Sequence, residues 1–309
     1  MLDITRLRVL VAVARLGSVT AAAKALRYAQ PSVSHHLARL EAETGSQLTQ
    51  RVGRGIRLTD AGRMLAERAE EILARLDAAE SELATYTGLR AGRVRLAAFP
   101  SALSTIVPRA AASLVEEHPD IELRFAEAEP PDAARMLRAG EVDVALLFSY
   151  DDVSPGGAPG HAQVRRGADS SDDGLRRIPV LREPTYLVAR KGTRGRTLRD
   201  HAGQRWIAGC DRCRAHLVRS CEQAGFTPDI RITTDDYVAV QSFVAAGLGV
   251  TTLPALALAA QRHPGVRVSV QPDGGRRVFA AVHGQAPDPP PTAALLRHLV
   301  AAGATIKLP

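Results

Sequence analysis

The sequence is poor in aromatic residues and cysteine, and it has no long hydrophobic run. Aromatic side chains make up 4% of its 309 residues, too few for the stacking platform of a barrel that binds single-stranded nucleic acid. Three cysteines, an odd number, exclude a scaffold of paired disulfides. No stretch of 18 apolar residues occurs, as a membrane span would need, and the first residues lack the features of a secretory signal. We therefore expect a cytoplasmic protein that does not interact with membranes.

The signatures of common enzymes are also missing. No Gly-x-Gly-x-x-Gly segment opens a helix, and neither a phosphate-binding loop nor a nucleophile elbow occurs. His161 and the aspartates around it do not form a set with catalytic spacing. We therefore expect no enzymatic activity, no catalytic residues and no cofactor.

Positive charge is concentrated in the first fifth of the chain. The net charge is +7, and residues 1–64 hold ten Lys and Arg against four Asp and Glu. Residues 65–91 hold three basic and six acidic residues, and residues 92–309 hold twenty-seven basic and twenty-three acidic residues. A basic module followed by a near-neutral body is typical of nucleic-acid binding. An arginine-rich proteome would also make every domain basic, and charge alone leaves this alternative open.

A first amphipathic helix is predicted close to the N-terminus. Its apolar residues recur at helical spacing and are Leu7, Leu10, Val11 and Ala14. Gly17 is placed to end this helix in the left-handed conformation. Thr20 is expected to cap a short alanine-rich helix over residues 21–26.

A third helix is predicted after a four-residue turn. Pro31 takes its first position, and Val33, Leu37 and Leu40 share one face. The opposite face is polar and basic and carries Ser32, Ser34, His35, His36 and Arg39. Two short helices with a tight turn and such an outer face indicate a DNA-binding helix-turn-helix. A three-helix bundle without a DNA role would look similar, since outer faces are ordinarily polar.

A β-hairpin is predicted after the third helix. Apolar and polar residues alternate over residues 48–52, the chain turns at residues 53–55, and the alternation resumes over residues 56–58. Arg54 lies at the tip, where a wing of this kind contacts the phosphate backbone or the minor groove of DNA.

These segments resemble the DNA-binding domain of LysR-type transcriptional regulators. The matching residues are 17–23, 30–34, 40–41, 45 and 58–62. Thr49 departs from the family, which usually has a Phe beside the wing. His35 and His36 also depart from the more frequent Arg-Gln, which leaves the operator sequence open. The residues expected to face DNA are Ser18, Thr20, Gln30, Pro31, Ser32, Ser34, His35, His36, Arg39 and Arg54.

A long helix with a narrow apolar stripe is predicted over residues 60–90. Its apolar residues are alternately four and three apart, a heptad seam, and are Leu65, Ala69, Ile72, Leu76, Ala79, Leu83 and Tyr86. A helix that is polar on most sides needs a partner. A second copy of the chain is the simplest partner, and its own effector domain is the alternative. The resemblance implies a homodimer through this helix, extended in some members to a homotetramer, with Leu65, Ile72, Leu76 and Leu83 as dimerisation residues.

Residues 91–309 are predicted to fold as alternating strands and helices. This alternation favours mostly parallel sheets with helices on their faces, and two such units would form a two-lobed ligand-binding body. The sequence here resembles the LysR-type effector domain, which is similar to periplasmic binding proteins. The residues that carry this resemblance are Gly92, Pro108, His118, Pro119, 140–143 and 245–254.

The expected architecture is therefore α/β with three parts. A winged helix-turn-helix covers residues 1–59, a long linker helix residues 60–90, and a two-lobed effector domain residues 91–309. Lobe I is expected over about residues 91–165 and 265–309, and lobe II over about residues 166–264. Residues 151–174, rich in Asp and Gly, are expected to form a floppy loop, with a lid over the cleft as the alternative.

Effector contacts are expected at the carboxyl ends of the strands. The first strand ends at Phe99, and the Ser101 hydroxyl with the amides after it suits an anion. Two carboxylates in the predicted set argue against a strongly anionic ligand, and Asp236 has an alternative role as a helix cap. The expected effector-binding residues are Phe99, Ser101, Ala102, Glu129, Phe148, Cys210 and Asp236.

A metal site or a redox pair is suggested by four residues near one another in the sequence, Cys210, Cys213, His216 and Cys221. Cys210 and Cys213 have the spacing of half a zinc site or of a redox pair at a helix N-terminus. On a continuous helix, however, Cys221 lies about two turns beyond Cys213, whereas zinc requires all ligands within about 2.0–2.3 Å. We therefore expect no metal site and ordinary cysteines at a cleft edge.

The sequence as a whole indicates a LysR-type, sequence-specific DNA-binding transcriptional regulator. The expected partners are double-stranded operator DNA, an unidentified small-molecule effector bound between the lobes, a second copy of the chain and RNA polymerase. The alternative is a small-molecule-binding protein, or a redox or metal sensor, in which DNA binding is secondary.

Overall fold

The computed structural model describes residues 2–309 except for residues 53–54, 87–91, 151–173 and 273–274. The chain divides into two compact units, Met1–Leu89 with Arg138–Glu141 and the remainder up to Pro309. Within the described ranges, no helix has the length and apolar character needed to cross a membrane.

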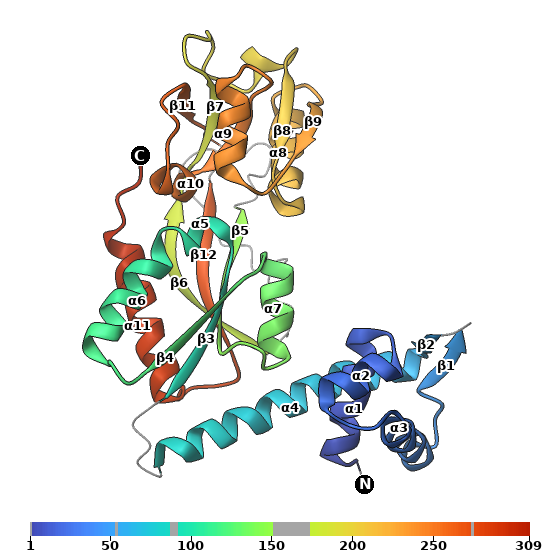
Figure 1. The fold of residues 1–309 in the computed structure, drawn as a ribbon. Coiled ribbons are helices and arrows are strands. Elements are labelled where there is room, and N and C mark those ends of the chain that lie inside the picture. The colour runs from blue at the N-terminus through green and yellow to red at the C-terminus, as the bar shows by residue number, and fades with distance from the viewer. Residues whose placement is uncertain (1, 53–54, 87–91, 151–173, 273–274) are drawn as a thin grey trace. The chain divides into compact units, whose positions relative to one another are not determined.

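The N-terminal unit is a winged helix-turn-helix that continues into a long helix (Figure 1). Its elements are α1 (Ile4–Leu16), α2 (Val19–Leu26), α3 (Gln30–Thr44), β1 (Thr49–Val52), β2 (Gly55–Leu58) and α4 (Asp60–Tyr86). β1 and β2 pair in antiparallel register, with Thr49 opposite Leu58. The predicted winged helix-turn-helix and linker helix are thereby confirmed.

The ends of these helices follow from local chemistry. Gly17 ends α1 with a φ of 60°, in the left-handed region predicted for it. The cap of α2 is Ser18, whose Oγ accepts a hydrogen bond from the backbone N–H of Ala21 at 3.3 Å. The prediction of Thr20 as the cap was wrong, because the extended backbone at Ser18 lets the helix begin two residues earlier than expected. α3 begins at Gln30, one residue before Pro31.

The core of this unit joins all its helices. Val33, Leu37 and Leu40 of α3 are at most 4% exposed, as their shared face predicts. Ala66, Ala69 and Leu73 of α4 belong to the same cluster. Its buried members are Leu7, Val9, Leu10, Val11, Val13, Ala22, Ala23, Val33, Leu37, Leu40, Leu48, Ala66, Ala69 and Leu73. The first part of α4 is thus anchored on its own helix-turn-helix.

The wing and the start of α4 meet at very close range. The backbone N–H of Thr59 donates to the carbonyl oxygen of Leu48 at 3.0 Å, and Thr59 Oγ1 donates to the carbonyl oxygen of Gln47 at 2.7 Å. Thr59 Oγ1 also accepts from the N–H of Gly62 at 3.0 Å, as an N-cap does. A Cβ on Gly62 would lie 2.0 Å from the Leu48 carbonyl oxygen, so only glycine fits there.

The C-terminal unit alternates strands and helices (Figure 1). In its first half these are β3 (Arg93–Ala98), α5 (Pro100–Leu103), α6 (Ile106–Glu117), β4 (Glu122–Glu127), α7 (Pro130–Arg138), β5 (Val144–Tyr150), β6 (Leu175–Glu183), β7 (Thr185–Arg190) and the 3-10 helix η1 (Arg199–His201). The second half has β8 (Arg205–Ala208), α8 (Asp211–Gln223), β9 (Asp229–Thr233), α9 (Tyr237–Ala245), β10 (Thr251–Pro254), α10 (Ala255–Ala260), β11 (Val266–Val270), β12 (Arg276–His283) and α11 (Pro290–Thr305).

Two groups of strands define the two lobes of this unit. In lobe I the order is β4-β3-β5-β12-β6, with β3 parallel to β4 and β5, and β12 antiparallel to β5 and β6. Lobe II holds the antiparallel sheet β10-β7-β11 and the parallel pair β8-β9. The expectation of mostly parallel sheets therefore holds only in part, because several strands run back after the chain has crossed between the lobes.

The crossovers lie elsewhere than expected. β6 belongs to the sheet of lobe I and β11 to that of lobe II, whereas the predicted limits assigned each to the other lobe. The chain passes between the lobes at Pro184, directly between β6 and β7, and again between β11 and β12. Strand pairing rather than the long segment 151–173, which lies outside the described residues, decides this division.

Candidate functional site

The outer face of α3 is a polar surface free of acidic side chains. Its exposed or half-buried residues are Gln30, Pro31, Ser32, Ser34, His35, His36 and Arg39. The two glutamates of α3 are both engaged elsewhere: Glu41 binds the base of the wing, and Glu43 pairs with Arg6. The hydrogen bond from the Arg6 guanidinium lowers the pKa of Glu43. This face therefore suits a polyanionic partner.

The histidines of this face form a small ring cluster. The rings of His35 and His36 lie 6.3 Å apart edge to face, and His36 lies 5.9 Å from the ring of Tyr28. Of the other residues predicted to face DNA, Thr20 is exposed and Ser18 is half-buried at the cap of α2. Arg54 lies outside the described residues.

Glu41 holds the wing in place. Its Oε1 accepts hydrogen bonds from the backbone N–H groups of Leu48 and Thr49, each at 2.9 Å. The hydroxyl of Thr49 donates to the same oxygen at 3.0 Å. Thr49, the departure noted in the sequence, therefore forms a hydrogen bond to a carboxylate at the base of the wing.

The predicted dimerisation seam of α4 divides into two parts. Leu65 packs against the core of its own unit, and Ala69 is fully buried there. Ile72 is 44% exposed and Leu76 is half-buried. The side chain of Leu83 lies outside the described residues. The exposed apolar part of this seam therefore begins at Ile72.

A cavity of about 550 Å³, counting its open mouth, lies between the lobes of the C-terminal unit. Its lining includes five of the predicted effector residues, Phe99, Ser101, Glu129, Phe148 and Cys210. The residues that sequence reasoning missed include Tyr150, Cys213, Asp235, Tyr237, Val240, Leu253, Ala257 and Arg276.

Two predicted effector residues lie outside this lining. Ala102 is fully buried in the core of lobe I. Asp236 caps α9, because its Oδ1 accepts from the N–H groups of Val238 and Ala239 at 2.9 and 3.1 Å. Its neighbour Asp235 lines the cavity in its place. Neither residue therefore lies in the lining of this cavity, and Asp236 has the helix-cap role that was its alternative.

The buried guanidinium of Arg276 forms the polar centre of the cavity. Arg276, whose side chain is 3% exposed, donates from Nε to Glu183 Oε1 at 2.5 Å and from Nη2 to Ser101 Oγ at 2.8 Å. It lies over the rings of Phe99 and Phe148, 4.8 and 4.4 Å from their centroids. Burial lowers the pKa of Arg276, but the Glu183 carboxylate outweighs it and keeps the guanidinium charged.

Sequence reasoning had no signal for this centre. Arg276 and Glu183 are 93 positions apart, and neither lies in a motif. They meet because β6 and β12 pair with these two residues opposite each other.

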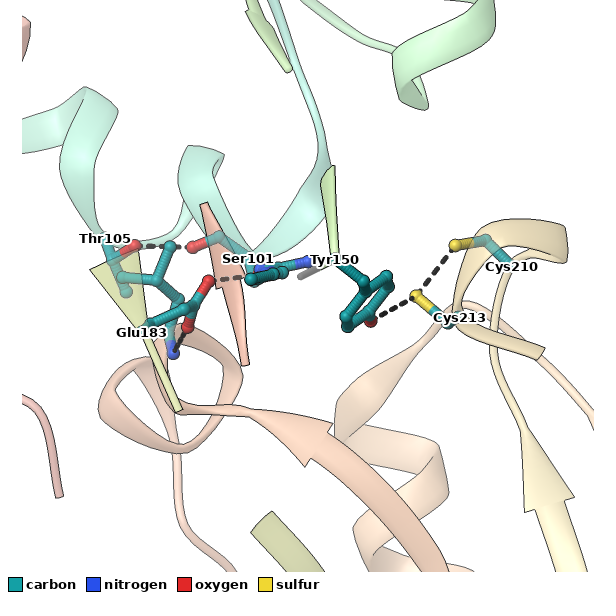
Figure 2. Close-up of polar contacts among 8 residues, drawn as sticks. Ser101, Thr105, Tyr150, Glu183, Cys210 and Cys213 are labelled. Atoms are coloured by element: carbon teal, nitrogen blue, oxygen red, sulfur yellow. Dashed lines mark hydrogen bonds and ion pairs between the residues drawn. The ribbon is translucent and has the colours of Figure 1, made fainter. Parts of the chain in front are cut away.

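Two cysteines close the other side of the cavity. Figure 2 shows the Tyr150 hydroxyl directed at Cys213 Sγ, 3.5 Å away, with Cys210 Sγ 2.9 Å beyond it. The hydrogen bond from Cys210 lowers the pKa of Cys213 and raises that of Cys210, so the pair loses its first proton from Cys213. His216 stacks on the Tyr150 ring at 3.8 Å.

The four candidate metal ligands of α8 do not converge. Cys221 is fully buried in a separate cluster with Trp206 and Leu217. Across the ranges that the structure describes, no three His, Cys, Asp or Glu side chains form a group that would hold a metal ion.

Glu129 places a carboxylate at the cavity, where burial and a neighbouring acidic residue both disfavour its charged form. Its Oε2 is buried and has no hydrogen-bond partner among the described residues. Burial raises the pKa of Glu129, and the nearby Asp235 raises it further, against a lowering by the Cys210 thiol. The cavity therefore combines a donor-only guanidinium with carboxylates.

Family models match nearly the whole chain. Residues 4–63 match the bacterial regulatory helix-turn-helix protein, lysR family, and residues 87–304 match the LysR substrate binding domain. The regulator YofA of Bacillus subtilis is 29% identical over 260 residues, 83% of each chain. A probable hydrogen peroxide-inducible genes activator of Mycobacterium avium is 30% identical over 295 residues, 89% of this chain and 86% of that one.

Structural similarity agrees with these matches. The full-length regulator CbnR in complex with its target DNA has a similar fold, with a TM-score of 0.60 and 21% identity over 97% of this chain and 100% of that chain. The helix-turn-helix, the linker helix and the two-lobed unit thus all have counterparts in one regulator. The chain belongs to the LysR family and is a DNA-binding transcriptional regulator with an effector-binding domain.

Proposed function

We propose that α3 reads the operator in the major groove while the cavity between the lobes binds the regulating effector. The observation that carries this proposal is the outer face of α3, where polar and basic side chains stand without a competing carboxylate. The proposed contacts from this face are Ser32, Ser34, His35, His36 and Arg39, with Gln30 and Pro31 at the start of the helix. Ser18 and Thr20 of α2 and Arg54 of the wing complete the DNA-binding set.

Fluorescence anisotropy with DNA from upstream of the protein's own gene tests this assignment. His36→Ala should weaken binding by about 1–3 kcal/mol and relax selectivity at one base pair. Arg199→Ala removes a charge from η1 in the other unit and should leave operator binding unchanged. If His36→Ala alters neither affinity nor site preference, α3 is not the reader.

The proposed assembly is a homodimer through α4, with a tetramer formed by further pairing. Ile72, Leu76 and Leu83 supply the apolar contact, because Leu65 packs on its own unit. Two recognition helices would then read half-sites about 10 bp apart, or a multiple of it. Leu76→Glu would bury an unpaired charge and should yield monomers in light scattering, whereas Arg75→Glu at the neighbouring exposed position should not.

The family consists of transcriptional regulators and not of enzymes. A regulator of this kind acts on DNA in the cytoplasm, and RNA polymerase is the further partner that we propose. Transcription from the operator with purified polymerase, with and without the protein, tests this step.

A further inference from the structure

The cavity holds hydrogen-bonding groups of opposite kind that the protein leaves unsatisfied. Arg276 uses Nε and Nη2, while Nη1 has no hydrogen-bond partner among the described residues. Glu129 Oε2 is shielded from solvent and likewise accepts no hydrogen bond there. Since buried polar groups without partners cost free energy, a ligand that supplies both an acceptor and a donor recovers it.

The charge balance of the cavity restricts the ligand further. Glu183 already neutralises Arg276, whereas Glu129 and Asp235 form no ion pair with any described residue. A ligand that carries only carboxylates would meet this excess of negative charge. A ligand that carries only a cation would leave Arg276 Nη1 unused. Both needs are met by a molecule with one carboxylate and one ammonium group.

The remaining wall of the cavity is apolar. It is lined by Tyr237 and Val240 of α9, Leu253 of β10 and Ala257 of α10. Such a wall binds an aliphatic or aromatic side chain through the hydrophobic effect. The ordered Ser101 hydroxyl adds a second donor beside Arg276, because Oγ already accepts from Nη2 and its own proton is available.

We propose that the effector is a free α-amino acid with an apolar side chain. Its carboxylate accepts hydrogen bonds from Arg276 and Ser101, its ammonium group donates to Glu129 and Asp235, and its side chain lies against the α9 wall. This assignment rests on the proposed function, that the cavity is the effector site of the regulator.

Isothermal titration of the full-length protein with blocked and unblocked ligands tests the assignment. The probes are L-leucine, L-isoleucine, L-valine, L-methionine and L-phenylalanine, with N-acetyl-L-leucine, L-leucinamide and benzoate as analogues that lack one charged group. At least one free amino acid should bind, and its analogues without the ammonium or the carboxylate should bind at least tenfold more weakly.

Variants locate the two ends of the ligand. Glu129→Gln should weaken the free amino acid at least tenfold and leave the N-acetyl analogue unchanged, whereas Ser101→Ala should weaken both. Glu127→Gln removes an exposed carboxylate two positions away and should change neither. Arg276→Lys retains the buried charge, and if it fails to fold, the Glu129 and Ser101 variants still decide.

Three results would overturn the ligand class: equal binding of benzoate or N-acetyl-L-leucine, no binding of any of the five amino acids, or no effect of Glu129→Gln. Operator binding in the same preparations separates this failure from that of the proposed function. DNA binding retained without amino-acid binding refutes the ligand class alone. Amino-acid binding that leaves operator affinity and DNA bending unchanged refutes the regulatory role of the cavity and leaves the ligand class standing.

Discussion

Arg276 and Glu183 form a buried ion pair at the place where the chain passes between the two lobes. Glu183 is the last residue of β6 and Arg276 the first of β12, and they lie opposite each other in the sheet. The second oxygen of Glu183 accepts from the N–H of Leu256 in α10 at 2.6 Å. One carboxylate thus ties both crossovers to a helix that follows a strand of lobe II.

Breaking this pair should destabilise the C-terminal unit strongly. Arg276→Gln leaves the Glu183 carboxylate buried without its cation, which costs about 3–5 kcal/mol. Urea unfolding monitored by the fluorescence of the buried Trp206 measures the loss. Arg277→Gln, at the exposed neighbouring position, is the control and should have little effect. A double change to methionine at both positions should recover much of the stability, and failure to do so would show that the pair itself is not the cause.

Glu41 should be required for the wing. Glu41→Gln weakens the charge-assisted hydrogen bonds to Leu48 and Thr49, for an expected loss of about 1.5–3 kcal/mol. Operator affinity should fall with it, because the wing loses its fixed position. Thermal unfolding and anisotropy measure the two effects. Glu43→Gln on the same helix breaks only the surface ion pair with Arg6, which solvent screens, and should lower the unfolding midpoint less.

Glu129 should make stability depend on pH. Burial raises the pKa of Glu129 in the folded protein, so the native state keeps this proton to a higher pH than the unfolded chain does. Its contribution is fully present below the unfolded pKa and is lost as pH rises through the folded pKa. Glu129→Gln should therefore unfold at higher urea concentration than the parent at neutral pH and lose this part of the decline. Equal slopes in both proteins between about pH 4 and pH 8 would contradict the prediction.

The three thiols should differ in reactivity. Burial raises the pKa of Cys221 to about 12, whereas the pKa of Cys213 is lowered by the hydrogen bond from Cys210. Because the thiolate is the nucleophile, iodoacetamide at about pH 8 should label Cys213 before Cys221 in the native protein. Peptide mass spectrometry over time measures the order. Cys210→Ala should slow the labelling of Cys213, and preferential labelling of Cys221 would refute the order.

Sequence reasoning succeeded where the signal is local. The left-handed Gly17 and the buried face of Val33, Leu37 and Leu40 follow from spacing alone. The prediction of Thr20 as the cap of α2 failed, because Ser18 has a similar hydroxyl and only the backbone conformation decides between them.

Local sequence patterns predict only part of the cavity lining. Its aromatic residues Phe99 and Phe148 follow from the ends of predicted strands. The place of Arg276 in the cavity depends on a strand pairing with a residue 93 positions away, and no local sequence pattern predicts that pairing. The adjacent aspartates 235 and 236 differ in role by one position, which is within the uncertainty of any predicted helix start.

The close approach of Gly62 to the Leu48 carbonyl has a mechanical consequence. Because there is no space between them, we expect the base of the wing and the first turn of α4 to move together. In a pair of chains joined along their linker helices, the crossing angle of those helices would set the separation of the two wings. A rotation of the far end of α4 would then change how the wings contact the DNA, even if each recognition helix stayed in the major groove.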